Sequence, residues 1–386
     1  MADNIRPAGV FDTNYDEDLR LDRTRGDKMR VWGGFILLLL VPVFSVNGII
    51  GGALPFAIPS VWVSILSSIA IFVIAAQGLN ILIGYTGQIS LGHAAFMAVG
   101  AYSSALLAKG FEVTLGGSLL QIGPFPFWLA LPLGALFTGL VGIVFGLPSL
   151  RVKGFYLAMA TLAAQFIIPW VIENPLKPWT NAPLALQEIP APALFGFTFS
   201  SRESMFYIII PLAVFLMLLA RNVIRTRTGR AFVSVRDNDL AAELLGINVF
   251  WYKLQAFFLS AVYAGIAGGL MAFERNALDP DFFSLVISIE LLAMLVIGGA
   301  GFPLAPLFGV AFVKLLNSWA IPTVAPFFGA AIPALLPFID VVNIGAALKP
   351  ILFGSSLVLF LIIEPRGLAY RWEILRIAWK IRPYSY

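Results

Sequence analysis

The chain of 386 residues has no cysteine and a single histidine, His93. The missing cysteines exclude disulfide bonds and thiolate chemistry, and one histidine cannot form a metal cluster alone. The chain also has no G-x-x-x-x-G-K-[ST] phosphate loop. We find neither a Ser/His/Asp arrangement nor a pair of catalytic carboxylates. These absences argue against an enzyme, and we expect the chain itself to bind no metal and no cofactor.

Charge is also scarce, and hydrophobic residues take its place. Charged residues make up 12% of the chain, about half of the roughly 25% that is usual in soluble proteins. Hydrophobic residues make up 59%, and the mean hydropathy is +0.90. Most apolar residues fall in runs close to the ~20 residues that a helix needs to cross a bilayer. The predicted fold is therefore all-α: a polytopic transmembrane helical bundle with broken or re-entrant helices.

Ten apolar segments are candidate crossings, with polar tails at 1–30 and 365–386 and a transmembrane domain at 31–364. An even number of crossings puts both tails, the 148–154 link and the 221–249 loop on one side. Those four segments hold 18 of the 25 lysines and arginines, which places them in the cytoplasm by the positive-inside rule. The predicted crossings are 31–50, 60–84, 88–108, 126–147, 154–173, 205–220, 251–273, 285–300, 303–320 and 347–363.

The remaining segments carry further expectations. The tail at 1–30 is polar, and we expect it to be poorly ordered and not to be a cleavable signal sequence. Residues 174–204 are rich in proline and predict an external loop. Residues 321–346 are apolar but contain four prolines, which favours a re-entrant or interfacial segment over an eleventh crossing. The pI near 9.3 does not indicate nucleic acid, because the basic residues lie between apolar runs, where membrane lipid is the expected neighbour.

Residues 84–96 combine glycines with polar side chains at a depth where the bilayer is expected. Glycines allow a helix to unwind, and free helix ends can then face a solute. Buried polar groups need partners there, so hydrogen bonding to neighbouring helices is an equally open interpretation. The backbone-breaking glycines are Gly84, Gly87 and Gly92, and the candidate residues of a translocation path are Thr86, Gln88, Ser90 and His93.

A second candidate lies in residues 285–301. Glu290 is an ionisable residue within an apolar run, which makes it a candidate for the path. A structural acid paired with a neighbouring helix or base is the alternative. Gly298, Gly299 and Gly301 predict a tight cytoplasmic turn into the next helix, where Lys314 is expected to be paired or to snorkel.

The 221–249 loop predicts a short amphipathic helix that docks on a partner. Asp237 or Asn238 is expected to cap it, and Gly246 to end it. Leu240, Leu244 and Ile247 recur at helical spacing. A helix of about eight residues is marginal alone in water, so a groove on a partner would stabilise it. The alternative is a surface helix that lies against the chain's own spans.

Five segments carry a family resemblance. The chain resembles the LivM-type permease subunit of ATP-binding-cassette importers for branched-chain amino acids. In the general loop pattern of such importers, Glu-Ala-Ala precedes a glycine by three residues. Ala241, Ala242 and Gly246 keep this spacing, and Leu240 stands in place of the glutamate. The matching segments are GLNILIGYTGQISLGHAAFMAVGAY (78–102), GFYLAMATLA (154–163), TGRAFVSVRDNDLAAELLGINVFWYKLQAFFLSAVYAGIAGGLMA (228–272), SIELLAMLVIGGAG (288–301) and EPRGL (364–368).

The resemblance implies a subunit of a bacterial inner-membrane importer. Its implied partners are a homologous LivH-type permease, two cytoplasmic ATP-binding subunits that use ATP and Mg²⁺, and a periplasmic or lipid-anchored solute-binding protein. Branched-chain amino acids are the implied cargo. Urea or short amides in a related importer are the alternative, and an ion-coupled secondary transporter is a third hypothesis. The residues implied to couple to the ATPase are Arg230, Arg236, Asp237, Asp239, Ala241, Ala242, Glu243 and Gly246.

Overall fold

The structure is a computed structural model. It describes residues 25–45, 59–115, 118–150, 156–182, 185–194, 196–320, 322–323, 350–351, 353–355, 357–360 and 362–381. Most of 321–346, the 151–155 link and nearly all of the N-terminal tail lie outside these ranges. The predictions for the link and for a re-entrant 321–346 segment therefore stay predictions.

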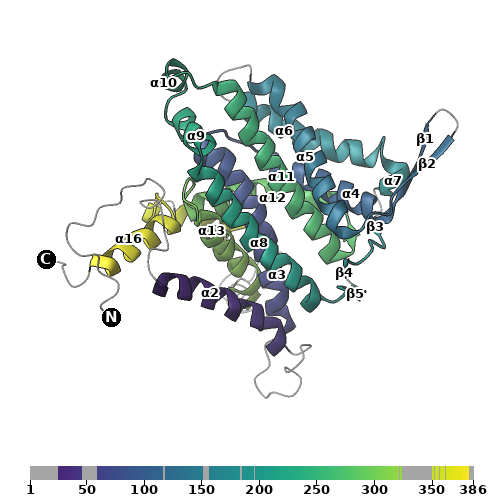
Figure 1. Cartoon of the computed structure of the whole chain (residues 1–386), viewed down its shortest axis with the longest axis horizontal. Helices are drawn as coiled ribbons and strands as arrows, with labels where there is room; N and C mark the ends of the chain where they lie inside the picture. The colour runs from purple at the N-terminus through teal and green to yellow at the C-terminus, as the bar shows by residue number, and fades with distance from the viewer. Residues whose placement is uncertain are drawn as a thin grey trace, which may run out of the picture.

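The described residues form a helical bundle, as the composition predicts (Figure 1). Among the described residues, five helices are long and apolar enough to cross a membrane: Ser60–Tyr85, Phe127–Leu147, Tyr156–Glu173, Arg202–Arg225 and Val249–Arg275. Shorter helices at His93–Lys109, Leu285–Gly298 and Ala305–Leu315 coincide with three other predicted crossings. Because these helices are short, the number of ten crossings stays a prediction. The principal helices are α2 (Arg25–Leu40), α3 (Ser60–Leu79), α4 (His93–Lys109), α5 (Phe127–Leu150), α6 (Tyr156–Glu173), α8 (Arg202–Arg225), α11 (Val249–Arg275), α12 (Leu285–Gly298) and α13 (Ala305–Leu315).

Smaller elements connect these helices. The described residues include three antiparallel strand pairs. The β1–β2 pair lies between α4 and α5, the β4–β5 pair precedes α8, and β6 follows α11 and pairs with β3. Figure 1 shows α10 at the opposite end of the bundle. The smaller helices are α7 (Lys177–Thr180), α9 (Arg227–Asp237), α10 (Asp239–Leu244) and α16 (Leu368–Ile381). The strands are β1 (Phe111–Leu115), β2 (Ser118–Ile122), β3 (Leu186–Gln187), β4 (Ala193–Leu194), β5 (Phe197–Thr198) and β6 (Ala277–Leu278).

Several predicted boundaries are wrong. The crossing predicted at 88–108 begins at His93, and α2 begins at Arg25, inside the tail that we expected to be poorly ordered. Helix α8 exceeds the predicted 205–220 at both ends because Ser201 caps it and its polar ends continue the helix. The predicted 221–249 loop is mostly helical: it holds the last turn of α8, then α9 and α10.

Helix α11 forms the centre of the bundle and packs against α3, α4 and α5. Its residues from 263 to 273 are almost all buried. Small residues allow the backbones of α4 and α11 to approach closely, as is common in membrane helices. A Cβ atom added at Gly268 would lie 1.9 Å from the carbonyl oxygen of Met97 in α4. A side chain at this crossing would therefore push the two helices apart.

We expect Gly268→Ala to destabilise the bundle by about 1–3 kcal/mol, the usual cost of overpacking a core. The measurement is the midpoint of denaturant-induced unfolding of the purified chain in detergent. Gly33→Ala is the control, because no atom lies within 4 Å of a Cβ at that helical position; it should be neutral or slightly stabilising. Equal midpoints for the two variants would contradict the close crossing.

Candidate functional site

The first part of the site is a break between α3 and α4. Helix α3 ends in a π-helical turn, η4 (Asn80–Tyr85), and α4 begins at His93. Residues 87–92 between them are not helical. Gly87 lies in the break with φ of +70°, a conformation that favours glycine. A break in an apolar helix within a bundle is where transport proteins place functional backbone.

The π-helical turn is fastened to the turn between α12 and α13. The Asn80 side-chain amide donates to the carbonyl oxygen of Phe302 (3.0 Å), and its oxygen accepts from the amide of Gly301 (2.8 Å). Gly84 must be a glycine here, since a Cβ atom would lie 2.4 Å from the Gly301 nitrogen. Gly299 and Gly301 both have positive φ. Asn80 was not among the predicted site residues, although an amide side chain within an apolar run is a signal visible in the sequence.

The first amides of α4 are already occupied by side chains from other helices. The amide of Ala94 donates to Oγ of Ser288 (2.9 Å), and the amide of Ala95 donates to Oε1 of Gln165 (3.1 Å). Ser288 also donates to Gln165 (2.8 Å). Of the two interpretations that the sequence left open, the start of α4 fits hydrogen bonding to neighbouring helices, because groups from α6 and α12 satisfy these amides. Gln165 and Ser288 were not among the predicted site residues.

The four candidate path residues in the break are buried in this conformation. Thr86, Gln88, Ser90 and His93 are each at most 6% exposed. His93 Nε2 lies 2.9 Å from the carbonyl oxygen of Ala75 in α3, a hydrogen bond between neighbouring helices. The Oγ of Ser90 finds no hydrogen-bond partner in the described part of the chain. The geometry thus supports the inter-helix interpretation for His93.

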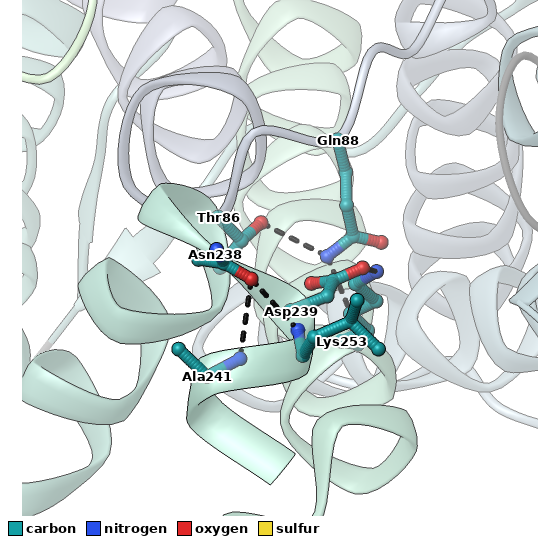
Figure 2. A network of polar contacts seen from close by, with 7 residues as sticks. Thr86, Gln88, Asn238, Asp239, Ala241 and Lys253 are labelled. Carbon is teal, nitrogen blue, oxygen red and sulfur yellow. Dashed lines mark hydrogen bonds and ion pairs between the residues drawn. The ribbon is translucent and has the colours of Figure 1, made fainter. Parts of the chain in front are cut away.

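A polar network joins the break to α10 (Figure 2). Gln88 Nε2 donates to Thr86 Oγ1 (2.9 Å) and to the carbonyl oxygen of Lys253 (3.3 Å) in the first turns of α11. The Lys253 ammonium forms an ion pair with Asp239 in α10. Asn238 precedes Asp239 and caps α10 by accepting from the amides of residues 240 and 241. Polar groups of the break, α11 and α10 therefore form one connected unit.

Arg236 makes a second connection from the end of α9. Its Nη1 donates to the carbonyl oxygen of Gly84 (2.9 Å), and its guanidinium also pairs with Asp237 (3.0 Å). Helix α9 positions it through buried Ala231, Phe232 and Val235. The sequence analysis did not predict α9, although these apolar residues at helical spacing face away from the arginines. Arg230, one and a half turns earlier, donates to the carbonyl oxygen of residue 225.

Helix α10 exposes large apolar side chains at the end of the bundle. Leu240 is 62% exposed, Leu244 is 90% and Leu245 is 79%. Gly246 follows with φ of +81°, as the predicted C-terminal stop requires. An exposed apolar patch on a short polar-flanked helix is characteristic of an interaction site. We call Leu240, Leu244 and Leu245 the leucine patch.

Details of α10 differ from the prediction. Asn238 caps the helix and Asp237 does not. Ala242, which we expected to touch a partner, is 1% exposed and packs α10 onto its own chain. Ile247 is half-buried, so it does not extend the leucine patch, whereas Ala241 and Glu243 are exposed. The burial of an alanine on the opposite side of the helix from exposed leucines cannot be read from spacing alone.

Glu290 belongs to a buried polar group of its own. Its Oε1 accepts from Asn317 (2.8 Å) and lies 4.0 Å from the ammonium of Lys314. The ammonium of Lys314 also stands 3.3 Å from the ring centroid of Phe72. The side chains of Glu290 and Lys314 are 14% and 13% exposed. This geometry supports the structural interpretation of Glu290.

We expect the single variant Lys314→Met to destabilise the chain by about 3 kcal/mol, because it leaves a buried carboxylate without its cation. Adding Glu290→Gln should recover most of this loss, because the remaining amide can still bond to Asn317. The measurement is a double-mutant cycle on the unfolding midpoint in detergent. Purely additive effects of the two substitutions would show that the pair does not interact.

Comparisons with known proteins identify the family of this chain. The family model described as "Branched-chain amino acid transport system / permease component" matches residues 61–360. The high-affinity branched-chain amino acid transport system permease protein LivM of Salmonella typhimurium is 32% identical over 290 residues, which are 69% of this chain and 63% of that protein. LivM of Escherichia coli is 32% identical over 64% of this chain and 61% of that protein.

A more distant relative carries a different name. The nucleoside ABC transporter permease protein NupC of Lactococcus lactis is 26% identical over 48% of this chain and 59% of that protein. The alignments thus span about three-fifths of the length of each of these relatives.

Proposed function

This chain belongs to the family of permease components of branched-chain amino acid transport systems, and from that premise we propose that it is one permease subunit of an ATP-driven importer. Its cargo is an amino acid, with branched-chain amino acids as the first candidates. The chain is a multi-pass membrane protein that supplies part of the translocation path. It does not hydrolyse ATP.

The observation that carries the proposal is the connection between the leucine patch and the break. The patch is exposed on α10, and α10 is joined to the break through Asp239, Lys253 and Gln88. Arg236 provides the parallel connection to Gly84. A surface that binds a partner is thus bonded to the irregular backbone inside the bundle. This is the arrangement that a chain driven by a separate ATPase requires.

The partners follow from the same premise. They are a second, homologous permease, two cytoplasmic ATP-binding subunits that use ATP and Mg²⁺, and an external solute-binding protein. The leucine patch fits a groove on one ATP-binding subunit. In this proposal α10 and both tails lie in the cytoplasm of a bacterium and the bundle lies in its inner membrane. The distribution of lysine and arginine supports this orientation.

Closure of the two ATP-binding subunits on ATP displaces α10. The Asp239–Lys253 ion pair transmits the movement to the first turns of α11, and Arg236 transmits it to η4. Asn80 bonds η4 to the α12–α13 turn. The break between α3 and α4 therefore moves together with the α12–α13 turn. This movement opens the path alternately to the two sides of the membrane.

The experiment is ATP-dependent uptake in proteoliposomes that contain the assembled importer with its solute-binding protein. We expect uptake of radiolabelled leucine that requires ATP and competes with isoleucine and valine, but not with urea or uridine. Competition by urea or uridine alone would assign a different cargo. Uptake by this chain alone under a proton gradient would refute the importer.

A further inference from the structure

A cavity of about 370 Å³ lies between α3, α8 and α11, at the end of the bundle opposite α10. It opens where α3 and α8 begin and where α11 ends. The polar side chains that line it are those of Ser64, Ser68, Arg202, Glu274 and Arg275. None of them belongs to the break or to the α10 network. The cavity is large enough for a small amino acid and lies on the face that the proposed function assigns to the outside.

The charged groups of the cavity are not paired with one another. In the part of the chain that the structure describes, the half-buried Glu274 carboxylate makes no hydrogen bond and no ion pair within 4.0 Å. It is nevertheless within electrostatic range of both guanidiniums. Arg202 donates to Ser64 Oγ (3.3 Å), and Arg275 stacks 3.8 Å above the ring of Phe282. These contacts hold both arginines in position and leave the carboxylate without a direct partner.

The rest of the wall is apolar. Ile71 and Phe72 of α3 and Met271 of α11 line it. One site therefore offers a carboxylate for an ammonium group, two guanidiniums for a carboxylate, and an aliphatic and aromatic surface for a hydrocarbon side chain. A few converging polar groups on an apolar wall are the usual composition of a small-molecule site.

We propose that this cavity is a binding site for a free, zwitterionic α-amino acid with an apolar side chain, held on the permease itself. Glu274 receives the ammonium group, Arg275 and Arg202 receive the carboxylate, and Ile71, Phe72 and Met271 contact the side chain. The inference rests on the proposed function and adds to it. The cargo is selected twice, first by the solute-binding protein and then by the permease itself.

Phe72 links the cavity to the Glu290 group. It lines the cavity, and the ammonium of Lys314, which pairs with Glu290, lies against its ring. Glu290 and Lys314 do not themselves line the cavity.

The test is equilibrium binding of radiolabelled L-leucine to the assembled importer in nanodiscs, without the solute-binding protein. Two analogues of leucine report separately on the ammonium contact and the carboxylate contact. 4-Methylpentanoate lacks the ammonium group, and 3-methylbutylamine lacks the carboxylate. Glu274→Gln should weaken leucine binding about tenfold or more and leave 4-methylpentanoate unchanged, since one charge-assisted contact is lost. Arg275→Gln should weaken leucine and 4-methylpentanoate and leave 3-methylbutylamine unchanged. Retained binding of the unaffected analogue shows that each variant is folded.

Glu203→Gln is the matched control. Glu203 follows Arg202 at the start of α8 and does not line the cavity, so this variant should leave leucine binding unchanged. Equal loss for leucine and both analogues, or no loss in either variant, would overturn the site. Leucine binding is also compared between nanodiscs of phosphatidylglycerol and nanodiscs of phosphatidylethanolamine. Only phosphatidylethanolamine has a zwitterionic headgroup that could occupy the cavity in place of an amino acid. Loss of leucine binding in phosphatidylethanolamine alone would assign the cavity to lipid and refute the proposal.

The two proposals fail differently. If the wild-type importer shows no ATP-dependent uptake of leucine, the proposed function is wrong. If wild-type uptake is intact and the KM for leucine is the same in Glu274→Gln, Arg275→Gln and wild type, the importer stands and the cavity is not its binding site.

Discussion

Uptake of leucine is expected to fall at least about 100-fold when Leu240 and Leu244 are both replaced by aspartate. Both side chains are mostly exposed, at 62% and 90%, so their loss removes little packing from the chain itself. Buried apolar residues at the centre of an interface contribute about 2 kcal/mol or more each, and each replacement also places a charge in the groove. The effect should therefore fall on assembly with the ATP-binding subunit.

Two measurements check this expectation: ATP-dependent uptake in proteoliposomes, and retention of the ATP-binding subunits when the tagged permease is purified. Phe197→Asp is the control, because Phe197 is similarly exposed, at 67%, in β5 at the other end of the bundle. It should leave both measurements unchanged. Normal uptake and normal retention in the double variant would refute the leucine patch as the docking surface.

Arg236→Gln should separate ATP hydrolysis from transport. The substitution removes the charge-assisted hydrogen bond to the Gly84 carbonyl, a contact of about 1.5–3 kcal/mol when it is well formed. Partial exposure, 37% for the side chain, favours the lower part of that range. The leucine patch is unchanged, so the ATP-binding subunits still assemble. We expect about tenfold less leucine transported for each ATP hydrolysed.

The measurement is the ratio of leucine uptake to phosphate release in the same proteoliposomes. Arg227→Gln is the matched control on α9, because Arg227 is an exposed arginine in the first turn of this helix and is not among the residues implied to couple to the ATPase. It should preserve the ratio. If Arg236→Gln lowers uptake and hydrolysis equally, Arg236 contributes to assembly or folding and does not transmit movement to η4.

The hydrophobic runs predicted the fold class correctly, because a bilayer requires long helices whose backbone groups are satisfied within the segment. The start of α4 was wrong by five residues for a physical reason. Gln88 and Ser90 sit in an apolar run, and hydropathy alone cannot tell a helical residue from one in a buried irregular segment. The segment is stabilised by Gly87 and by contacts to residues far away in the sequence, such as Lys253.

The sequence also indicated a short capped helix before Gly246, because the cap and the stop are local features. It did not indicate α9, whose buried face depends on packing against the bundle. Nor did it separate Ala242, which is buried, from its neighbour Ala241, which is exposed. Both alanines fit the spacing, and the difference arises only when α10 packs against α9 and α11.

By itself, the composition determined that this protein is a helical membrane protein, because long apolar runs with little charge suffice for that. The resemblance of five segments indicated the permease family, which the family model matches over residues 61–360. The tertiary structure alone decided which polar groups meet. Asn80 reaches the α12–α13 turn, Arg236 reaches Gly84, and Glu274 faces a cavity with Arg202 and Arg275. The first two contacts join segments that lie far apart in the sequence, and the cavity brings Arg202 of α8 to the end of α11. No local pattern encodes these distances.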